Sequence, residues 1–446
     1  MARRIFALSL FFLAAACTHA LPPLAAGCEL KAYPLPVDPH WNSASDSVSD
    51  SADTSGREDC AGTGARTPLQ AAICRVAAAS RGGGDEAARP RALLLSGGSQ
   101  HGAFGAGFFQ VEPVPSYNIV SGVSTGALQS TFLFLANRQV RNDRVYPAYV
   151  TDRRPPAQHT NVGDLELAYS IAREKDLMTV RSGGIPAAVV HGALARFDGL
   201  RGVIKDLISP GTLEDIADEG KTRLLVVGVT NVDDGAGYAL DLTELASRMP
   251  RNPTPEQAAP FQNCFAEALI ASSSVPLAVP PVMLRIRTDE ARPAEPHLFI
   301  DGGARYSVIF EQLRRQAPGD HWDVDALVNG GFFIPAWTKA GQPWSLPSVG
   351  MRSLDVLENQ VSRFSVYDVF RRDNPGRTRL AYIGPGAPAF RFTIDGVEQT
   401  CSDWSRADER DYKVTEFHPR YMRCLIAYGR SRVGANRWDR VEPPGS

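Results

Sequence analysis

From about residue 91 onward, short apolar runs that end in glycine or polar residues alternate with longer apolar segments. The short runs are typical of buried parallel strands, and the longer ones of helices that face a core. This pattern predicts strands at 92–95, 117–120, 223–229, 298–300, 380–383 and 389–394, and helices at 127–136, 353–371 and 421–432. Strands and helices in alternation predict an α/β domain with a central, mainly parallel sheet that is flanked by helices.

The N-terminal residues have the pattern of an export signal. Arg3 and Arg4 precede an uncharged apolar run at 5–16, which is too short to span a bilayer. Three alanines then lead to Cys17, and this junction resembles a bacterial lipobox. We interpret residues 1–16 as a signal peptide and Cys17 as a lipidation site, which predicts anchorage to a membrane surface in the bacterial periplasm or outer membrane. A plain secretory signal cut near Ala16 is the alternative.

The remaining sequence divides into four further segments. Residues 17–66 are rich in Ser and Asp around 43–59 and are predicted to form a largely disordered tether. Residues 67–90 are predicted to hold a short helix at 67–81 and a glycine linker at 82–84. The main domain is predicted at 91–430, and residues 431–446 form a C-terminal tail.

Composition narrows the possible partners of the 446-residue chain. The net charge is −2 and no dense Lys/Arg run occurs, which argues against a nucleic-acid partner. Neither a CxxC pair nor a His/Asp/Glu cluster with ligand spacing is present, so no metal or other cofactor is expected. Oligomeric state is left open.

Apart from Cys17, the chain has six cysteines, which permit 15 sets of disulfide pairings. Proximity in the sequence favours disulfides among Cys28, Cys60 and Cys74, and between Cys401 and Cys424.

The segment Gly122-Val123-Ser124-Thr125-Gly126 has the GxSxG pattern of a nucleophile elbow. In such an elbow a sharp strand-to-helix turn exposes the serine hydroxyl, and Gly122 and Gly126 are needed where the backbone is crowded. The motif is short enough to occur by chance, but an apolar strand precedes it and an apolar helix follows it, as the elbow requires. Ser124 is therefore a candidate nucleophile.

A glycine-rich loop, 97–107, directly follows the predicted strand at 92–95. Such a loop directs backbone N–H groups toward a negative charge. It lacks the ending of a P-loop and the glycine spacing of a dinucleotide site. Because Ser124 follows about 20 residues later, we interpret Gly97, Gly98 and Ser99 as an oxyanion hole, with Gly102 supporting the loop.

The third element, Asp301-Gly302-Gly303, ends the predicted strand at 298–300. Taken alone, an Asp-Gly pair here is most often only a turn. A glycine-rich loop, GxSxG and a distant Asp-Gly-Gly in this order, however, resemble the patatin-like phospholipase family, and the segment 268–282 resembles the helix-to-proline segment that precedes its aspartate. The resemblance implies a three-layer α/β fold and hydrolysis of a lipid or other acyl ester by a Ser124–Asp301 dyad, supported by Gly302.

Two positions depart from the family pattern, and two other functions remain open. Ser99 stands where a third glycine is usual, and His101 replaces the usual Arg or Lys. An α/β-hydrolase with a Ser-His-Asp triad would use His321 or His418, neither of which lies in a recognisable motif. The second alternative is an envelope protein that binds lipid without turning it over.

Overall fold

The computed structural model describes residues 20–25, 27–35, 67–81, 89–152, 154–182, 192–310, 313, 322–332, 334, 346–372, 378–434 and 437–439. Several predicted features lie outside these residues: the signal peptide at 1–16, Cys17, most of the tether, the glycine linker at 82–84, His321 and most of the C-terminal tail. Within these ranges no helix is both long enough and apolar enough to cross a membrane.

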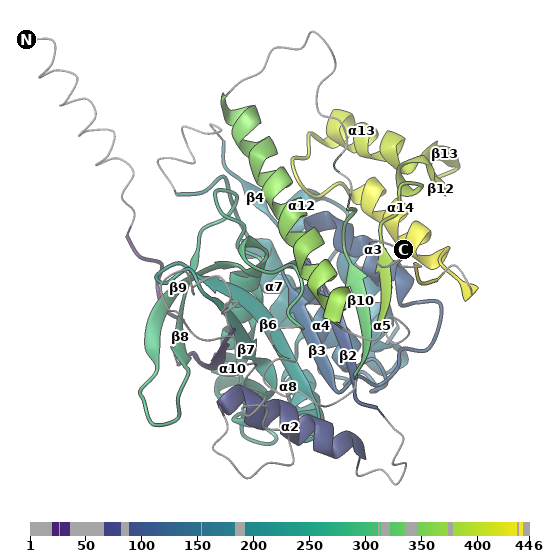
Figure 1. Ribbon diagram of the computed structural model, residues 1–446. Coiled ribbons are helices and arrows are strands. Elements are labelled where there is room, and N and C mark those ends of the chain that lie inside the picture. The colour runs from purple at the N-terminus through teal and green to yellow at the C-terminus, as the bar shows by residue number, and fades with distance from the viewer. Residues whose placement is uncertain are drawn as a thin grey trace, which may run out of the picture.

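A nine-stranded mixed sheet forms the centre of the molecule (Figure 1), which confirms the α/β fold. Its parallel half runs in the order β11 (Thr378–Tyr382), β10 (Asp323–Val328), β2 (Arg91–Leu95), β3 (Ile119–Val123) and β6 (Leu224–Asn231). The order continues through β7 (Gly237–Asp241), β1 (Glu29–Pro34), β8 (Val282–Arg287) and β9 (Glu295–Asp301). Most strand pairings in this second half are antiparallel.

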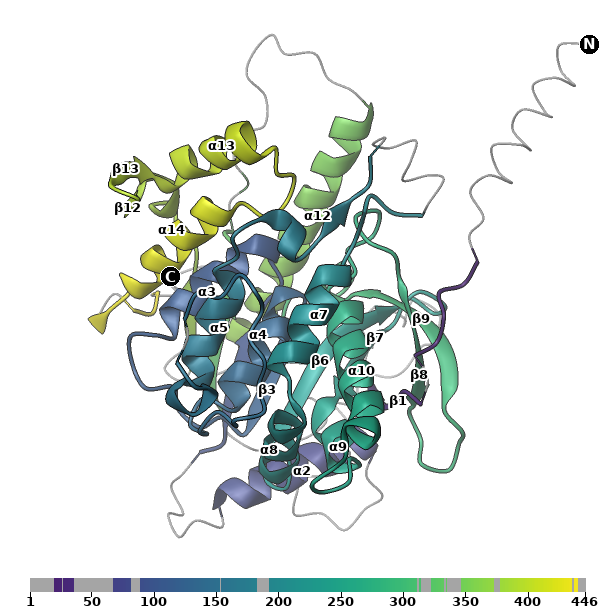
Figure 2. The same ribbon diagram turned by 180° about the vertical axis from the view of Figure 1, so that it is seen from behind.

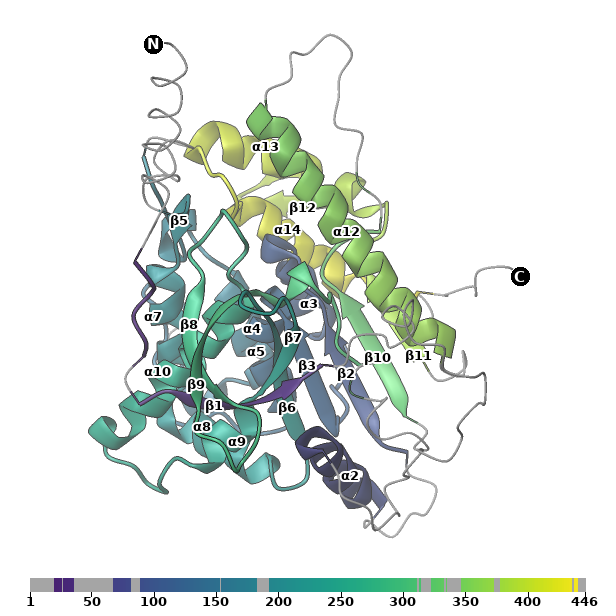
Figure 3. The ribbon, with the colours of Figure 1, turned by 60° about the vertical axis from the view of Figure 1, so that its left-hand side comes forward.

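The second half of the sheet closes on itself. β9 pairs with β6 as well as with β8, so that β6, β7, β1, β8 and β9 form a small barrel. Figure 3 looks into this ring of strands. β6 is therefore shared, because it ends the parallel half and also forms one wall of the barrel.

Helices cover both faces of the sheet, since alternate strand residues are apolar on each side. β2 shows the alternation: Ala92 and Leu94 join one core cluster, and Leu93 and Leu95 join the other. The first face carries α2 (Pro68–Arg81) and α12 (Leu346–Arg372). The opposite face (Figure 2) carries α3 (Gly102–Phe108), α4 (Thr125–Phe134), α5 (Asn161–Tyr169), α7 (Asp198–Leu207), α8 (Pro210–Glu219), α9 (Leu242–Ser247), α10 (Pro255–Ser272) and α14 (Pro419–Arg430).

Residues 29–34, which were predicted to belong to the tether, instead form β1. Leu30 and Ala32 are buried, and the strand pairs with β7 on one side and β8 on the other. A disulfide from Cys28 to Cys264 of α10 fixes the start of this strand. The prediction that Cys28 pairs within the N-terminal group is therefore wrong, because the fold places this cysteine beside a helix far along the chain.

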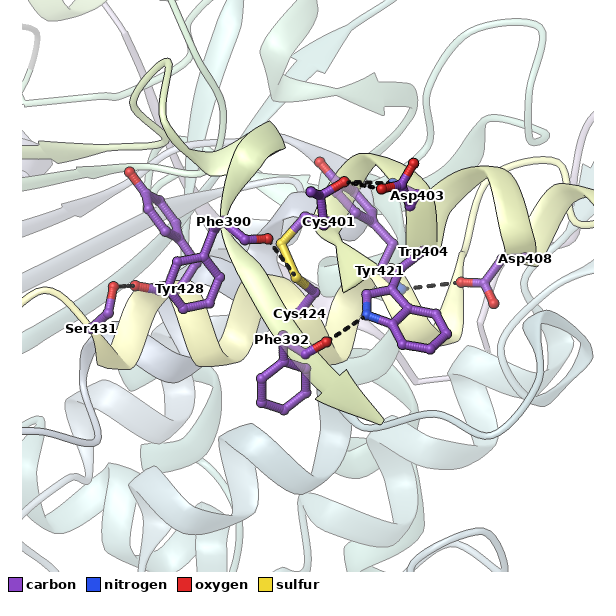
Figure 4. The surroundings of a disulfide bond; sticks show 11 residues. Phe390, Phe392, Cys401, Asp403, Trp404, Asp408, Tyr421, Cys424, Tyr428 and Ser431 are labelled. Carbon is purple, nitrogen blue, oxygen red and sulfur yellow. Dashed lines mark hydrogen bonds between the residues drawn. A yellow bond between two sulfur atoms is a disulfide. The ribbon is translucent and has the colours of Figure 1, made fainter. Parts of the chain in front are cut away.

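The C-terminal region adds a small hairpin, β12 (Arg391–Ile394) with β13 (Val397–Thr400), and then α13 (Cys401–Tyr412) before α14. Figure 4 shows the Cys401–Cys424 disulfide that joins α13 to α14, as proximity in the sequence predicted. Beside it, the Trp404 indole N–H donates a 3.0 Å hydrogen bond to the Phe392 carbonyl. A short ribbon of β4 (Thr179–Val180) and β5 (Ala195–Arg196) completes the described strands.

Candidate active site

The ends of β3 and β9 meet along one edge of β6. β3 is parallel to β6, and its last residue, Val123, lies opposite Gly228. β9 is antiparallel to β6, and its last residue, Asp301, lies opposite Val229. This register brings Asp301 together with Ser124, the residue directly after β3, although the two are far apart in the sequence.

Ser124 lies in a strained turn between β3 and α4. Its backbone has φ 54° and ψ −124°, a conformation that is costly for a residue with a side chain and is often found at functional sites. The flanking glycines allow this turn to be tight. A Cβ on Gly122 would lie 2.3 Å from the Gly126 carbonyl oxygen, and one on Gly126 would lie 2.3 Å from the Leu95 carbonyl oxygen.

The other two glycines named from the sequence also allow close backbone packing. A Cβ on Gly102 would lie 2.3 Å from Thr125 Oγ1, and one on Gly302 would lie 2.4 Å from the Gly228 carbonyl oxygen. Gly102 therefore holds the glycine-rich loop close to the elbow, and Gly302 holds the Asp301 turn close to β6.

Two serines at the end of α10 hold both sides of the site. The Ser124 N–H donates to Ser272 Oγ at 3.0 Å, and that hydroxyl donates to the Gly228 carbonyl at 2.7 Å. The Asp301 N–H donates to the Ser274 carbonyl at 2.9 Å. Neither serine is marked by a motif of its own, although both lie in the 268–282 segment that carries part of the family resemblance.

Asp301 is buried, with 4% of its surface exposed, and its environment changes its proton affinity. Burial raises the pKa of Asp301 to about 7, while the Ser124 hydroxyl and the Gly303 N–H, at 2.6 Å, lower it and the charge of Glu358 raises it. Among the described residues, Asp301 Oδ2 has no hydrogen-bond partner of normal geometry. That oxygen is therefore available to accept a proton.

The glycine-rich loop presents unused donors beside Ser124. The N–H groups of Gly97, Gly98 and Ser99 donate to no acceptor in the described part of the chain. Gly97 packs against the nucleophile candidate, because a Cβ there would lie 3.1 Å from Ser124 Cβ. Free backbone donors in such a loop are suited to binding a negative oxygen.

Asn329, which directly follows β10, holds this loop in place. Its N–H donates to Ser96 Oγ at 2.8 Å, and its amide nitrogen donates to the Ser96 carbonyl at 2.9 Å and to Gln129 Oε1 at 2.8 Å. Gln129 in turn donates to the Gly102 carbonyl at 2.7 Å. Asn329 was not among the predicted site residues, although a polar residue followed by two glycines at the end of an apolar strand was a usable signal.

The two departures from the family pattern have compensating contacts. Ser99 has a left-handed backbone, φ 48°, and its hydroxyl donates to the Glu416 carboxylate. His101 Nδ1 lies 3.0 Å from the Gly98 carbonyl oxygen, and burial lowers the pKa of His101, which favours a neutral ring. The C-terminal region therefore supports a loop that lies more than 300 residues earlier.

The histidine of the triad alternative makes other contacts. His418 Nδ1 lies 3.2 Å from Ser405 Oγ, and its ring is edge-on to Tyr421. No hydrogen bond between His418 and Ser124 is present in the described structure. Within the same residues, no three His, Cys, Asp or Glu side chains gather as they would around a metal ion.

Comparison with known proteins identifies the domain that contains this site. The sequence model of the patatin-like phospholipases matches residues 93–314. Residues 93–314 belong to the patatin-like phospholipase family. The patatin-like domain includes Ser124 and Asp301, and membership of the family implies lipid acyl hydrolase activity. β10 and β11 extend its sheet beyond the matched residues.

The other two comparisons add little to this assignment. The crystal structure of VipD from Legionella pneumophila is 13% identical to the chain and covers 76% of it and 67% of VipD, with a TM-score of 0.27. No curated protein matches the sequence.

Proposed function

We propose that the protein is a serine lipid acyl hydrolase in which Ser124 is the nucleophile and Asp301 the general base. The observation that carries this proposal is the meeting of β3 and β9 on adjacent residues of β6, which puts the strained Ser124 beside a buried carboxylate. Unused N–H groups at Gly97, Gly98 and Ser99 support the same chemistry.

The proposed reaction has two steps. Ser124 Oγ attacks the acyl carbonyl while its proton passes to Asp301, and the N–H groups of the loop bind the resulting oxyanion. Asp301 gives that proton to the leaving alcohol, which leaves the acyl group on Ser124. Asp301 then takes a proton from water as the hydroxide attacks the acyl carbon, and it gives this proton to Ser124 Oγ as the bond to the acyl group breaks and the carboxylic acid is released.

The pKa of Asp301 predicts the pH dependence of this reaction. A general base must be ionised, and burial raises the pKa of this carboxyl to about 7. We expect kcat/KM to increase about tenfold per pH unit below this pKa and to level off above it. A pH–rate profile on a soluble ester measures this, and a plateau that extends down to pH 5 would contradict the assigned base.

The decisive experiment is hydrolysis of p-nitrophenyl esters of several chain lengths, with Ser124→Ala and Asp301→Asn as variants. Turnover by the parent that is lost in both variants supports the dyad. No turnover by a folded parent refutes the proposal and favours the lipid-binding alternative. Any shortened form must keep Cys28 and β1, because both belong to the folded domain.

The triad alternative has its own test. Since His418 contacts Ser405 and Tyr421, we expect His418→Gln to keep most of the turnover. His321→Ala tests the remaining candidate, and loss of turnover with retained folding in either variant would favour a triad.

For location, we propose export and lipidation of Cys17. The Cys28–Cys264 and Cys401–Cys424 disulfides suit an oxidising compartment. Mass spectrometry of the mature N-terminus tests this proposal, and an unmodified Cys17 would leave the protein secreted.

A further inference from the structure

α12 has apolar side chains on two opposite faces. Val366 and Val369 face inward and belong to the core on one side of the sheet. Val356, Leu357, Phe364 and Tyr367 are 48%, 61%, 64% and 41% exposed. At 3.6 residues per turn, these four side chains fall within one arc of about 100°. We call them the outer face of α12.

In the part of the chain that the structure describes, the side chains of this outer face are exposed rather than packed against another element. Figures 1 and 3 show α12 running along the outside of the sheet, with its inner side toward the strands. Single exposed apolar residues are common on protein surfaces, but these four form a patch on one helix face, with the polar Gln360 between the two pairs. Such patches mark contact with another protein or with a membrane.

The inner face of the same helix borders the candidate active site on two sides. Ser365 Oγ accepts a 3.0 Å hydrogen bond from the Ser307 N–H, in the segment that follows Asp301. Asn359 donates at 3.0 Å to the Gly331 carbonyl, in the segment that follows Asn329. The charge of Glu358 also raises the pKa of Asp301. α12 therefore lies between the active site and the molecular surface.

A fifth exposed apolar side chain, outside α12, belongs to a loop of the candidate active site. Leu277 is 63% exposed and has a left-handed backbone, φ 70°. It lies three residues after Ser274, whose carbonyl holds the Asp301 N–H. Apolar surface is thus present on the helix beside the site and on a loop that forms it.

We propose that the outer face of α12 docks on the surface of a phospholipid bilayer, and that this contact brings lipid substrate to Ser124. The inference rests on the proposed function, because the family implies a lipid substrate and lipids are held in bilayers. α12 carries four arginines and three acidic residues, so its charges nearly balance. Burial of apolar side chains, rather than attraction to anionic headgroups, therefore drives the docking.

Co-flotation with phosphatidylcholine vesicles tests the contact apart from catalysis. The protein is the mature chain with Cys17→Ser, which removes the lipidation site, and with Ser124→Ala, which prevents hydrolysis. We expect it to bind vesicles equally well at 50 and 500 mM NaCl. Leu357→Gln combined with Phe364→Gln replaces two apolar side chains with glutamine, which is a good helix former. This double variant should lower the partition coefficient into vesicles at least tenfold.

The matched control is Val145→Gln, on the loop that follows α4. Val145 is 57% exposed, similar to the α12 residues, and we expect this change to leave vesicle binding unaltered. Equal binding by the α12 variant and the parent, or binding that is lost at high salt, would overturn the proposal. A parent dimer that becomes monomeric in the α12 variant would overturn it in favour of a second copy of the chain.

A soluble short-chain ester separates this proposal from the proposed function. With Ser124 intact, the α12 variant should hydrolyse p-nitrophenyl butyrate at the parent rate and phosphatidylcholine vesicles at least tenfold more slowly. A parent that hydrolyses neither substrate but still floats with vesicles refutes only the proposed catalysis. Equal loss on both substrates would show that α12 acts on the active site itself and would overturn docking as its role.

Discussion

The two halves of the sheet contribute to the candidate site by different means. In the parallel half, β2 and β3 are short buried strands, and each leads within a few residues into a tight glycine-containing turn. In the barrel half, the position of Asp301 depends on the pairing of distant segments, β1 with β8 and β9 with β6, in addition to the local β8–β9 hairpin. The positions of the proposed nucleophile and oxyanion donors thus depend on local geometry, and the position of the proposed base depends on long-range assembly around β6.

The largest expected effect on turnover comes from a substitution that changes the backbone of the glycine-rich loop in the parallel half. Gly98 has φ 146°, and a Cβ there would lie 1.5 Å from the Asn329 carbonyl oxygen. We expect Gly98→Ala to shift the loop and its N–H donors and to lower kcat at least 10³-fold, since losing one such donor costs about 10²–10³-fold. Ester turnover by the folded variant measures the effect.

The neighbouring loop offers a matched control for this substitution. A Cβ on Gly330 would meet no atom within 4 Å, so Gly330→Ala should keep kcat within about twofold of the parent. Near-parental activity in Gly98→Ala would mean that the N–H groups of this loop do not bind the oxyanion.

In the barrel half, Asp301→Asn should change the pH dependence of stability, which can be measured without turnover. The folded pKa of about 7 exceeds the unfolded value near 4, so the parent loses stability as pH rises through this window. The Asp301→Asn variant has no charge to bury, so it does not lose this stability. Its free energy of unfolding should exceed that of the parent by an amount that grows to as much as about 4 kcal/mol between pH 4 and pH 8. Urea unfolding at pH 4 and pH 8 measures this difference in the free energy of unfolding. A difference that is the same at the two pH values would contradict a raised pKa of Asp301.

The parallel half could be predicted largely from the sequence because its signals are local. The strands at 92–95 and 117–120, the helix at 127–136 and the glycine turns beside Ser124 all follow from adjacent residues, and β2, β3 and α4 correspond to them with displaced ends. Asp301 was found by its turn sequence, but its place beside Ser124 comes from the register of β6, which the sequence does not display.

The barrel half was mostly missed for the same physical reason. β1 lies in a stretch that resembled a tether, and its six residues become a strand only because β7 and β8 pair with it on both sides. Cys28 was assigned to near neighbours, whereas its partner Cys264 is 236 residues away. Asn329, Ser272 and Ser274 lie in segments with a sequence signal, but their roles depend on which backbone groups the fold brings to them.

The two described disulfides provide a third test of local against long-range structure. Removing Cys28–Cys264 by paired serine substitutions should lower the free energy of unfolding by about 3 kcal/mol or more. The same change at Cys401–Cys424, which closes a loop from a separation of 23 residues, should cost less because a short loop loses less chain entropy. Urea unfolding of the two double variants shows which disulfide contributes more to the free energy of unfolding. A larger decrease on removal of Cys401–Cys424 would mean that the barrel does not depend on the Cys28–Cys264 disulfide.

The smallest effect is expected in the parallel half, at the Asn329 side-chain amide that holds the glycine-rich loop. Asn329→Ala removes the hydrogen bonds of the side-chain amide to Ser96 and Gln129, but it keeps the backbone N–H bond to Ser96 Oγ. The loop should therefore remain present but less well positioned, with kcat lowered about tenfold, about 1.4 kcal/mol, and KM for a soluble ester nearly unchanged. Asp301 depends on the barrel, so the pH profile should keep its inflection near 7. A shifted inflection, or a change in KM alone, would mean that Asn329 acts on the base or on substrate binding, and that the two halves of the site are not positioned independently.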